Sequence, residues 1–174
     1  MVTQQQIEEA LVDGFHGIKI NPEQIVQTDS VPRELLDQVI QLIKEGESVI
    51  LYTAMGPDDE AISATRDLFN QLGIPEFQSG ELIGRQLGKW TREVMEATGI
   101  RRVIVAGGDT SGFATREMGV YGLEMLLPIS PGAPLCKAYS DKSLMNGIEI
   151  ALKGGQLGGS NYFSNVQKAT NESK

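Results

Sequence analysis

The chain has 174 residues, which suits a single domain with its own core, and 40% of them are hydrophobic. Its 15 lysines and arginines against 23 aspartates and glutamates give a net charge of −8, which disfavours nucleic-acid-binding and polybasic membrane-binding proteins. One cysteine, Cys136, and one histidine, His16, exclude an internal disulfide, a cysteine zinc site and a multi-histidine metal site. With no signal-peptide pattern and no apolar run near 18 residues, we expect a cytoplasmic protein without nucleic-acid or membrane partners.

The first segments predict a helix and a short strand. Thr3 and Gln6 have the spacing of a capping box, in which both side chains bond backbone amides at a helix start. Apolar residues then recur at helical spacing until Gly14, which suits a C-terminal cap. A short strand is expected at residues 17–20.

A second helix and the first buried strand follow. Asp29, Ser30 and Pro32 predict the start of this helix, and Gly46 predicts its end. The run at residues 48–54 is almost continuously apolar and β-branched, which is typical of a strand buried on both faces.

Two further helices are expected before the middle of the chain. The acidic run at 58–60 places negative charge at the start of the first, where the helix dipole favours it. A metal site made by the same carboxylates is the less favoured alternative. The second helix, at 79–98, is the longest, and the four-residue spacing of Gly84 and Gly88 permits close approach of another helix.

The second half begins with a buried strand at 102–106 and a helix that ends near Met118. Further strands are predicted at 121–129, 135–139 and 147–152, and a last helix at 162–169. The turns between these strands are too short for crossover helices, so they favour antiparallel or mixed pairing.

The predicted fold class is α/β: a three-layer domain with a mixed β-sheet and helices on both faces. Because the runs at 49–53 and 103–106 are both continuously apolar, we expect them to be central neighbours or near-neighbours in one sheet.

Two glycine clusters carry the strongest functional signal. The first is Gly107-Gly108-Asp109-Thr110-Ser111-Gly112, and the second is Gly154-Gly155-Gln156-Leu157-Gly158-Gly159-Ser160. Each follows a predicted strand and precedes a predicted helix, an arrangement in which backbone N–H groups and a helix N-terminus bind phosphate. The alternative for the first cluster is a tight turn capped by Asp109 or Thr110, and the second taken alone is a common type of turn. We expect the clusters to converge in space.

Several single residues have open or structural interpretations. Asp109 can serve as helix N-cap, as Mg²⁺ ligand or as acceptor for a sugar hydroxyl, and the N-cap role is favoured for the free domain. Lys153 can offer its charge to a phosphate or be an ordinary lysine at a strand end. His16 is expected at the surface, and Cys136 and Trp90 in the core. Neither cluster has the P-loop or dinucleotide-binding spacing, which disfavours nicotinamide and flavin cofactors.

Four segments together resemble a known family. They are GGDTSGFATREMGV, PISPGAPLCKA, ALKGGQLGGSNYF and VTQQQIEEALVDGF. They are similar to the C-terminal nucleotide-binding domain of the four-carbon acid sugar kinases, which act on substrates such as threonate and erythronate. The likeness covers nearly the whole chain. Gly154 stands where the family usually has a serine, so any hydroxyl contact there is lost.

The resemblance implies an ATP site shared by the two clusters, with Mg²⁺ neutralising the phosphate charge. The expected nucleotide-site residues are Gly107, Gly108, Asp109, Thr110, Ser111, Gly112, Gly154, Gly155 and Gly158. No protein-held metal site is expected.

The resemblance also implies that nucleotide and sugar acid bind to different domains. Residues 1–169 are expected to form a single nucleotide-binding domain, with a polar tail at 170–174. We expect this chain to lack the family's N-terminal domain, which binds the sugar acid, and the glycine- and serine-rich segment that comes before the first helix in the family. Phosphoryl transfer needs both substrates held in line, so we expect little or no kinase activity from this chain. The catalytic base is expected on the N-terminal domain.

Two rival functions stay open. One is a non-enzymatic binding or effector module that retains the fold without nucleotide affinity. The other is an acidic scaffold that completes a separately encoded N-terminal half. The sequence leaves the sugar acid and the oligomeric state open, a homo-oligomer included.

Overall fold

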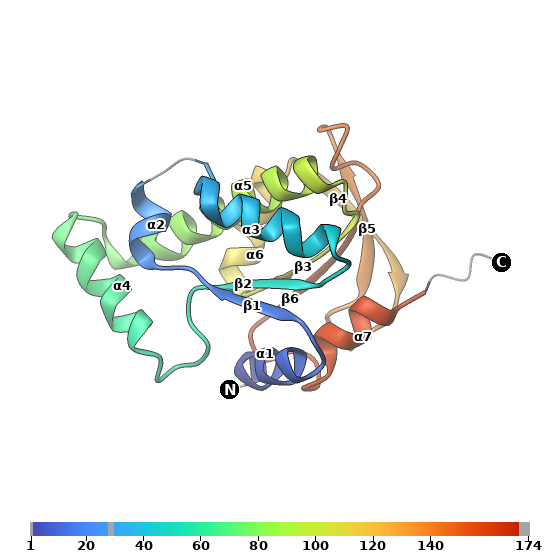
Figure 1. Cartoon of the computed structure of the whole chain (residues 1–174), viewed down its shortest axis with the longest axis horizontal. Helices are drawn as coiled ribbons and strands as arrows, with labels where there is room; N and C mark the ends of the chain where they lie inside the picture. Colours follow the sequence, from blue (N-terminus) through green and yellow to red (C-terminus); the bar gives the residue numbers. More distant parts are fainter. Residues whose placement is uncertain (1, 28–29, 171–174) are drawn as a thin grey trace.

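The computed structural model describes residues 2–27 and 30–170, which form helices and strands in alternation followed by a strand-rich segment (Figure 1). In chain order the elements are α1 (Val2–Val12), β1 (His16–Lys19), α2 (Pro22–Gln27), α3 (Arg33–Lys44), β2 (Val49–Tyr52), α4 (Glu60–Gln71), α5 (Glu76–Thr98), β3 (Arg102–Ala106), α6 (Gly108–Glu117), β4 (Val120–Leu127), β5 (Leu135–Ser140), β6 (Glu149–Lys153) and α7 (Tyr162–Lys168).

The strands form two sheets. β1 and β2 make a parallel pair, and the other four strands form a mixed sheet in the order β3-β6-β5-β4. β3 and β6 run parallel, whereas β5 pairs antiparallel with both β6 and β4. The mixed α/β class and the antiparallel pairing inferred from the short turns are therefore confirmed.

The predicted pairing of the two apolar runs is wrong. β2 and β3 belong to different sheets, and each is an edge strand of its own sheet. The reason is that continuous apolar character indicates burial by helices on both faces but does not specify the neighbouring strand. The two edges border a common cavity.

Helices cover both faces of the strands. In Figure 1, α3 and α5 lie above β1 and β2, and α1 and α7 lie below them. Three hydrophobic clusters fill these layers. One lies between β2 and the helices α3 and α5, one between the strands β3, β5 and β6 and the helices α5 and α6, and one against α1 and α7. Trp90 is fully buried and Cys136 is 8% exposed, as expected for core residues, while His16 is exposed. No helix in the described ranges is long and apolar enough to cross a membrane.

Several helix boundaries differ from the predictions. α5 begins at Glu76 rather than at residue 79, because Pro75 already has the extended backbone of an N-cap. The short helix α2 was not predicted, since six residues carry too little periodicity. α3 begins after Pro32, and Asp29, part of its predicted start signal, lies outside the described residues, as do residues 171–174 of the predicted tail.

The predicted close helix contact occurs between α5 and α6. A Cβ added at Gly88 would lie 2.6 Å from the Cα of Ala114, and one at Gly84 would lie 2.9 Å from the carbonyl of Thr110. Only glycine allows this approach. The contact fixes the position of α6, whose first turn belongs to the first glycine cluster.

Candidate functional site

The two glycine clusters meet at the carboxyl ends of neighbouring parallel strands. We call residues 107–112 the first glycine loop and residues 154–160 the second. Ala106 of β3 is paired in register with Lys153 of β6, so each loop leaves the sheet at the same level. The N–H of Gly107 donates to the carbonyl of Lys153 at 3.0 Å. The expected convergence is therefore observed, at the edge of a parallel pair where ligands commonly bind.

The first glycine loop presents the open start of a helix. Gly107 is the N-cap of α6 and has a φ of 136°, a conformation that favours glycine. Among the described residues, the N–H groups of Gly108, Asp109 and Thr110 donate no hydrogen bond, whereas Ser111 N–H donates to Gly107 O at 3.1 Å. Three outward N–H groups and the positive end of the helix dipole make this turn suitable for an anion.

The expectation that Asp109 or Thr110 caps this helix is wrong. Gly107 takes the cap position because its backbone is the last non-helical one before α6. Asp109 lies within the first turn and is exposed. Its carboxylate is therefore not committed to capping α6. The Ser111 hydroxyl donates back to Gly108 O at 2.8 Å, so it stabilises the turn rather than a ligand.

The second glycine loop is held by the first turns of α1. The Thr3 hydroxyl donates to Gly155 O at 2.7 Å. The Gln6 side-chain amide donates to Leu157 O at 2.9 Å and to Gly159 O at 2.8 Å, and Gln6 is fully buried. The predicted capping box is wrong, because both side chains bond a loop about 150 residues away instead of their own helix. Local spacing contained no signal of this use.

Lys153 is the buried charge at the junction of the two loops. It is 1% exposed, and its Nζ donates to Thr3 Oγ1 at 3.0 Å. Within the described ranges no carboxylate lies at ion-pair distance, and burial lowers the pKa of this lysine. An ammonium has three donors, of which one bonds an acceptor among the described residues. Lys153 is therefore not an ordinary strand-end lysine.

The sequence held a usable signal for this burial. Side chains alternate between the two faces of a strand, so Lys153 shares a face with Ala151, which packs against α1 and α7. A lysine on a covered face must be buried and needs a partner, and an anion from a ligand would satisfy that need.

The glycines of the two loops have different surroundings. Nothing lies within 4 Å of a Cβ added at Gly108 or Gly112, and at Gly155 the nearest atom is Thr3 Oγ1 at 3.9 Å. At Gly158, in contrast, φ is 85° and a Cβ would lie 2.8 Å from the Tyr162 ring. Gly158 therefore shapes the loop, and the other three leave open space beside the backbone.

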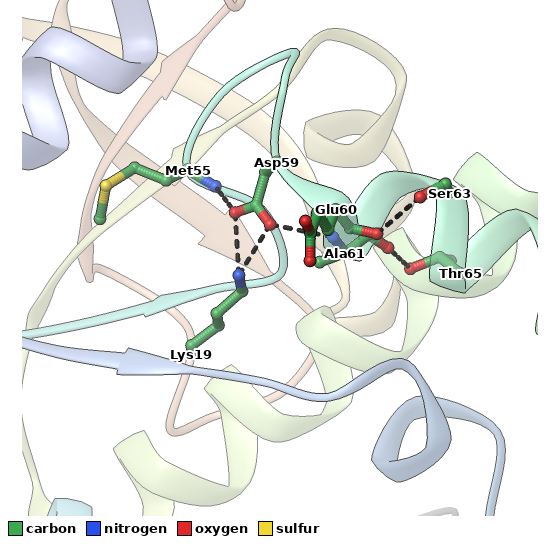
Figure 2. Close-up of polar contacts among 7 residues, drawn as sticks. All are labelled: Lys19, Met55, Asp59, Glu60, Ala61, Ser63 and Thr65. Atoms are coloured by element: carbon green, nitrogen blue, oxygen red, sulfur yellow. Dashed lines mark hydrogen bonds and ion pairs between the residues drawn. The ribbon is translucent and has the colours of Figure 1, made fainter.

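A third loop, between β2 and α4, borders the same region. Asp59 caps α4 by accepting from Ala61 N–H at 2.9 Å, and it also accepts from Met55 N–H at 2.8 Å and from Lys19 Nζ at 2.7 Å (Figure 2). The Lys19 bond and the two amides lower the pKa of Asp59 to about 2. Gln4 of α1 packs directly on Gly56 of this loop.

The structural role predicted for the acidic run is thus confirmed at Asp59. The Lys19 ammonium already pairs with the Asp59 carboxylate, which a metal ion would need as a ligand. No group of three or more histidine, cysteine, aspartate or glutamate side chains in the described part of the chain is arranged to hold a metal ion.

Comparison with known proteins agrees with this geometry. Residues 1–163 match the family described as nucleotide-binding C-terminal domain. The chain is 32% identical over 170 residues to the 3-oxo-isoapionate kinase of Paraburkholderia graminis, covering 96% of this chain and 36% of that protein. It is 27% identical over 169 residues to a 3-oxo-tetronate kinase of Pseudomonas savastanoi, covering 97% and 36%. The chain thus spans about a third of the length of these curated relatives.

Solved structures show the same fold. Haemophilus influenzae protein HI1011 superposes with a TM-score of 0.70 at 23% identity, over 96% of this chain and 37% of that one. A Bordetella bronchiseptica protein, described as a domain-swapped dimer with bound citrate, has a TM-score of 0.65 at 15% identity, over 94% and 37%. The chain therefore belongs to the nucleotide-binding C-terminal domain family of the four-carbon acid sugar kinases.

Proposed function

We propose that the two glycine loops bind the phosphates of ATP, in a kinase that phosphorylates four-carbon sugar acids of the threonate, erythronate or 3-oxo-tetronate type. One observation carries this proposal. The unpaired N–H groups at the start of α6 and the buried Lys153 ammonium stand at the ends of adjacent parallel strands. Together they offer several hydrogen-bond donors and one positive charge that no described carboxylate pairs with, which suits a polyphosphate.

The residues present also fit Mg²⁺ brought by the nucleotide. Mg²⁺ usually takes one or two carboxylates together with phosphate oxygens and water. Asp109 supplies one exposed carboxylate in the first turn of α6, beside the N–H groups proposed to bind phosphate. A bound Mg²⁺ would neutralise phosphate charge. Without a cation Asp109 would repel the phosphates, so ATP affinity should depend on Mg²⁺.

The acceptor side of the reaction is proposed to lie outside residues 1–169. The relatives named as kinases are about three times as long as this chain. In-line phosphoryl transfer needs an acceptor hydroxyl positioned against the γ-phosphate and a base to receive its proton. The two glycine loops provide hydrogen-bond donors for phosphate, but they contain no histidine and only one carboxylate, Asp109. We therefore expect the purified chain not to phosphorylate threonate or erythronate, and turnover well above background would place the acceptor site here after all.

Calorimetric titration of the chain with ATP tests nucleotide binding. Saturable binding at millimolar concentration or tighter, weakened by removal of Mg²⁺, supports the proposal. The same titration with AMP is the matched control, because it lacks the β- and γ-phosphates and should bind much more weakly. A folded chain that binds neither nucleotide contradicts the proposal and favours a non-enzymatic module.

A further inference from the structure

β2 and β3 each leave one backbone edge unpaired. His16 N–H donates to Ser48 O and Ile20 N–H donates to Tyr52 O, so alternate residues of β2 face β1. By the same alternation, Val49, Leu51 and Thr53 present their N–H and C=O groups to the other side. No strand in the described residues pairs with that side.

The edge of β3 is unpaired in the same way. Glu149 N–H donates to Arg101 O and Gly107 N–H donates to Lys153 O, so the odd-numbered residues of β3 face β6. Arg102, Ile104 and Ala106 therefore present their backbone groups away from β6. Polar backbone groups that are covered without partners are costly, so two such edges call for a partner.

A cavity of about 640 Å³ separates the two edges. All six of these edge residues line it, which means that the unpaired groups of both strands border the same space. Helices close it on both faces: Val39 and Leu87 come from α3 and α5, and Ile7 and Phe163 from α1 and α7. This space therefore lies within the sheet layer. Although β2 is entirely apolar, it is only half-buried, as expected for a strand that lacks a neighbour.

The direction of the chain would allow a strand in this cavity to continue into α1. Thr3, in the first turn of α1, lines the cavity. So do Ala54, which comes shortly after β2, and Ala106, the last residue of β3. A strand parallel to β2 and β3 would thus end at the start of α1, within reach of the short connection usual between a strand and a helix. The matched family is a C-terminal domain, and the kinase relatives are about three times as long, so their additional polypeptide lies mainly before this domain.

We propose that this cavity receives an extended apolar segment that, in a longer polypeptide, lies before α1 and is joined to it by a short loop. The segment, about five residues long, would lie about 4.8 Å from each edge, pair parallel with β2 and β3, and join the two sheets into one. Apolar side chains would alternate between the α3–α5 layer and the α1–α7 layer. This inference does not depend on nucleotide binding.

Three N-terminal extensions of the full 174-residue chain test the proposal. The first carries five alternating valines and isoleucines and a three-residue linker. The second replaces alternate residues by proline, which keeps an apolar segment but removes donors to the ladder. The third is a glycine–serine segment of equal length. Hydrogen exchange of the edge amides, resolved by NMR, is the readout, with Ile50 and Val105, which face β1 and β6, as internal references.

We expect the first extension alone to slow exchange at the amides of Leu51, Thr53, Ile104 and Ala106 by at least a hundredfold, and to raise the thermal midpoint. Equal protection from the proline extension would mean that apolar filling without strand pairing suffices, and would overturn the proposal. So would slow exchange of these amides in the unextended chain, since β2 and β3 would then pair directly. Protection of one edge only would also overturn it.

Discussion

The N–H of Gly107 donates to the carbonyl of Lys153 across 3.0 Å, so the first glycine loop begins at a residue bonded to the last residue of β6. The two loops therefore cannot move apart without breaking this bond. A phosphate that contacts the start of α6 lies close to the residues that follow Lys153. This is why substitutions in either loop should affect the same ligand.

Replacing Gly155 by valine should weaken ATP binding. The backbone at Gly155 is not left-handed, and no atom lies closer than 3.9 Å to an added Cβ, so the fold should tolerate the substitution. The two methyl groups would occupy the open space proposed for phosphate or ribose. We expect affinity to fall by about tenfold or more, equivalent to roughly 1.4 kcal/mol.

Calorimetry measures this affinity, and thermal unfolding verifies the fold of the variant. Gly155→Ala is the graded control and should lie between wild type and Gly155→Val. Unchanged ATP affinity in a folded Gly155→Val protein would remove Gly155 from the site, although the loops still meet.

Replacing Lys153 by methionine should also weaken ATP binding by about tenfold or more, because the charge nearest the junction is lost. Among the described residues the buried ammonium has one hydrogen-bond partner, which is neutral, so the apolar substitute should leave stability unchanged or raise it. Lys168→Met, on the exposed side of α7, removes the same charge elsewhere and should leave affinity unchanged. If both variants lose affinity equally, net charge rather than position is responsible.

The same lysine predicts a pH dependence of stability. Burial lowers its folded-state pKa below 10.5, so between these two pKa values the unfolded chain binds more protons. The free energy of unfolding should therefore rise with pH through that window in the wild-type protein, and this rise should be absent in Lys153→Met. Urea unfolding at a series of alkaline pH values measures the difference. A parallel pH profile for the two proteins would show that Lys153 does not titrate abnormally.

Adding a methyl group at Gly88 should destabilise the contact that positions the first glycine loop. A Cβ there would lie 2.6 Å from the backbone of Ala114, so α6 must shift. We expect Gly88→Ala to lower stability by about 1–3 kcal/mol, in the range of overpacking, and to weaken ATP binding. Gly80→Ala, in the same helix with nothing within 4 Å, should instead gain about 0.5–1 kcal/mol. Chemical denaturation of the pair measures both effects, and equal values would contradict the close contact.

Asp59 should contribute to stability against acid. Its pKa is lowered from 3.8 to about 2, so its contribution is complete above about pH 5 and disappears as pH falls toward 2. Asp59→Asn should lose this part of the acid dependence while keeping a cap for α4. Asp59→Ala should also cost about 1 kcal/mol at neutral pH through the lost cap. Urea unfolding between pH 7 and pH 2 distinguishes the two variants. If the free energy of unfolding of Asp59→Asn fell with pH as in the wild type, Asp59 would not be the group responsible.

The sequence by itself determined the parts of this protein that depend on short-range chemistry. The glycine at 107 allows a φ of 136° without help from any distant residue. The apolar runs that became β2 and β3 indicate strands from their own composition. The spacing of Gly84 and Gly88 likewise predicts a close helix contact before its partner is known. The two glycine clusters, with their flanking strands, indicated a phosphate site.

Tertiary structure alone decided which groups far apart in the chain share one environment. The uses of Thr3 and Gln6 were mispredicted because the carbonyls that they bond lie about 150 residues away. The burial of Lys153 arises from α1 packing across β6, and apolar character did not reveal that β2 and β3 border a cavity instead of each other. The physical reason is the same in each case: local patterns specify conformation and burial, whereas the partner of a buried polar group is set by the whole fold.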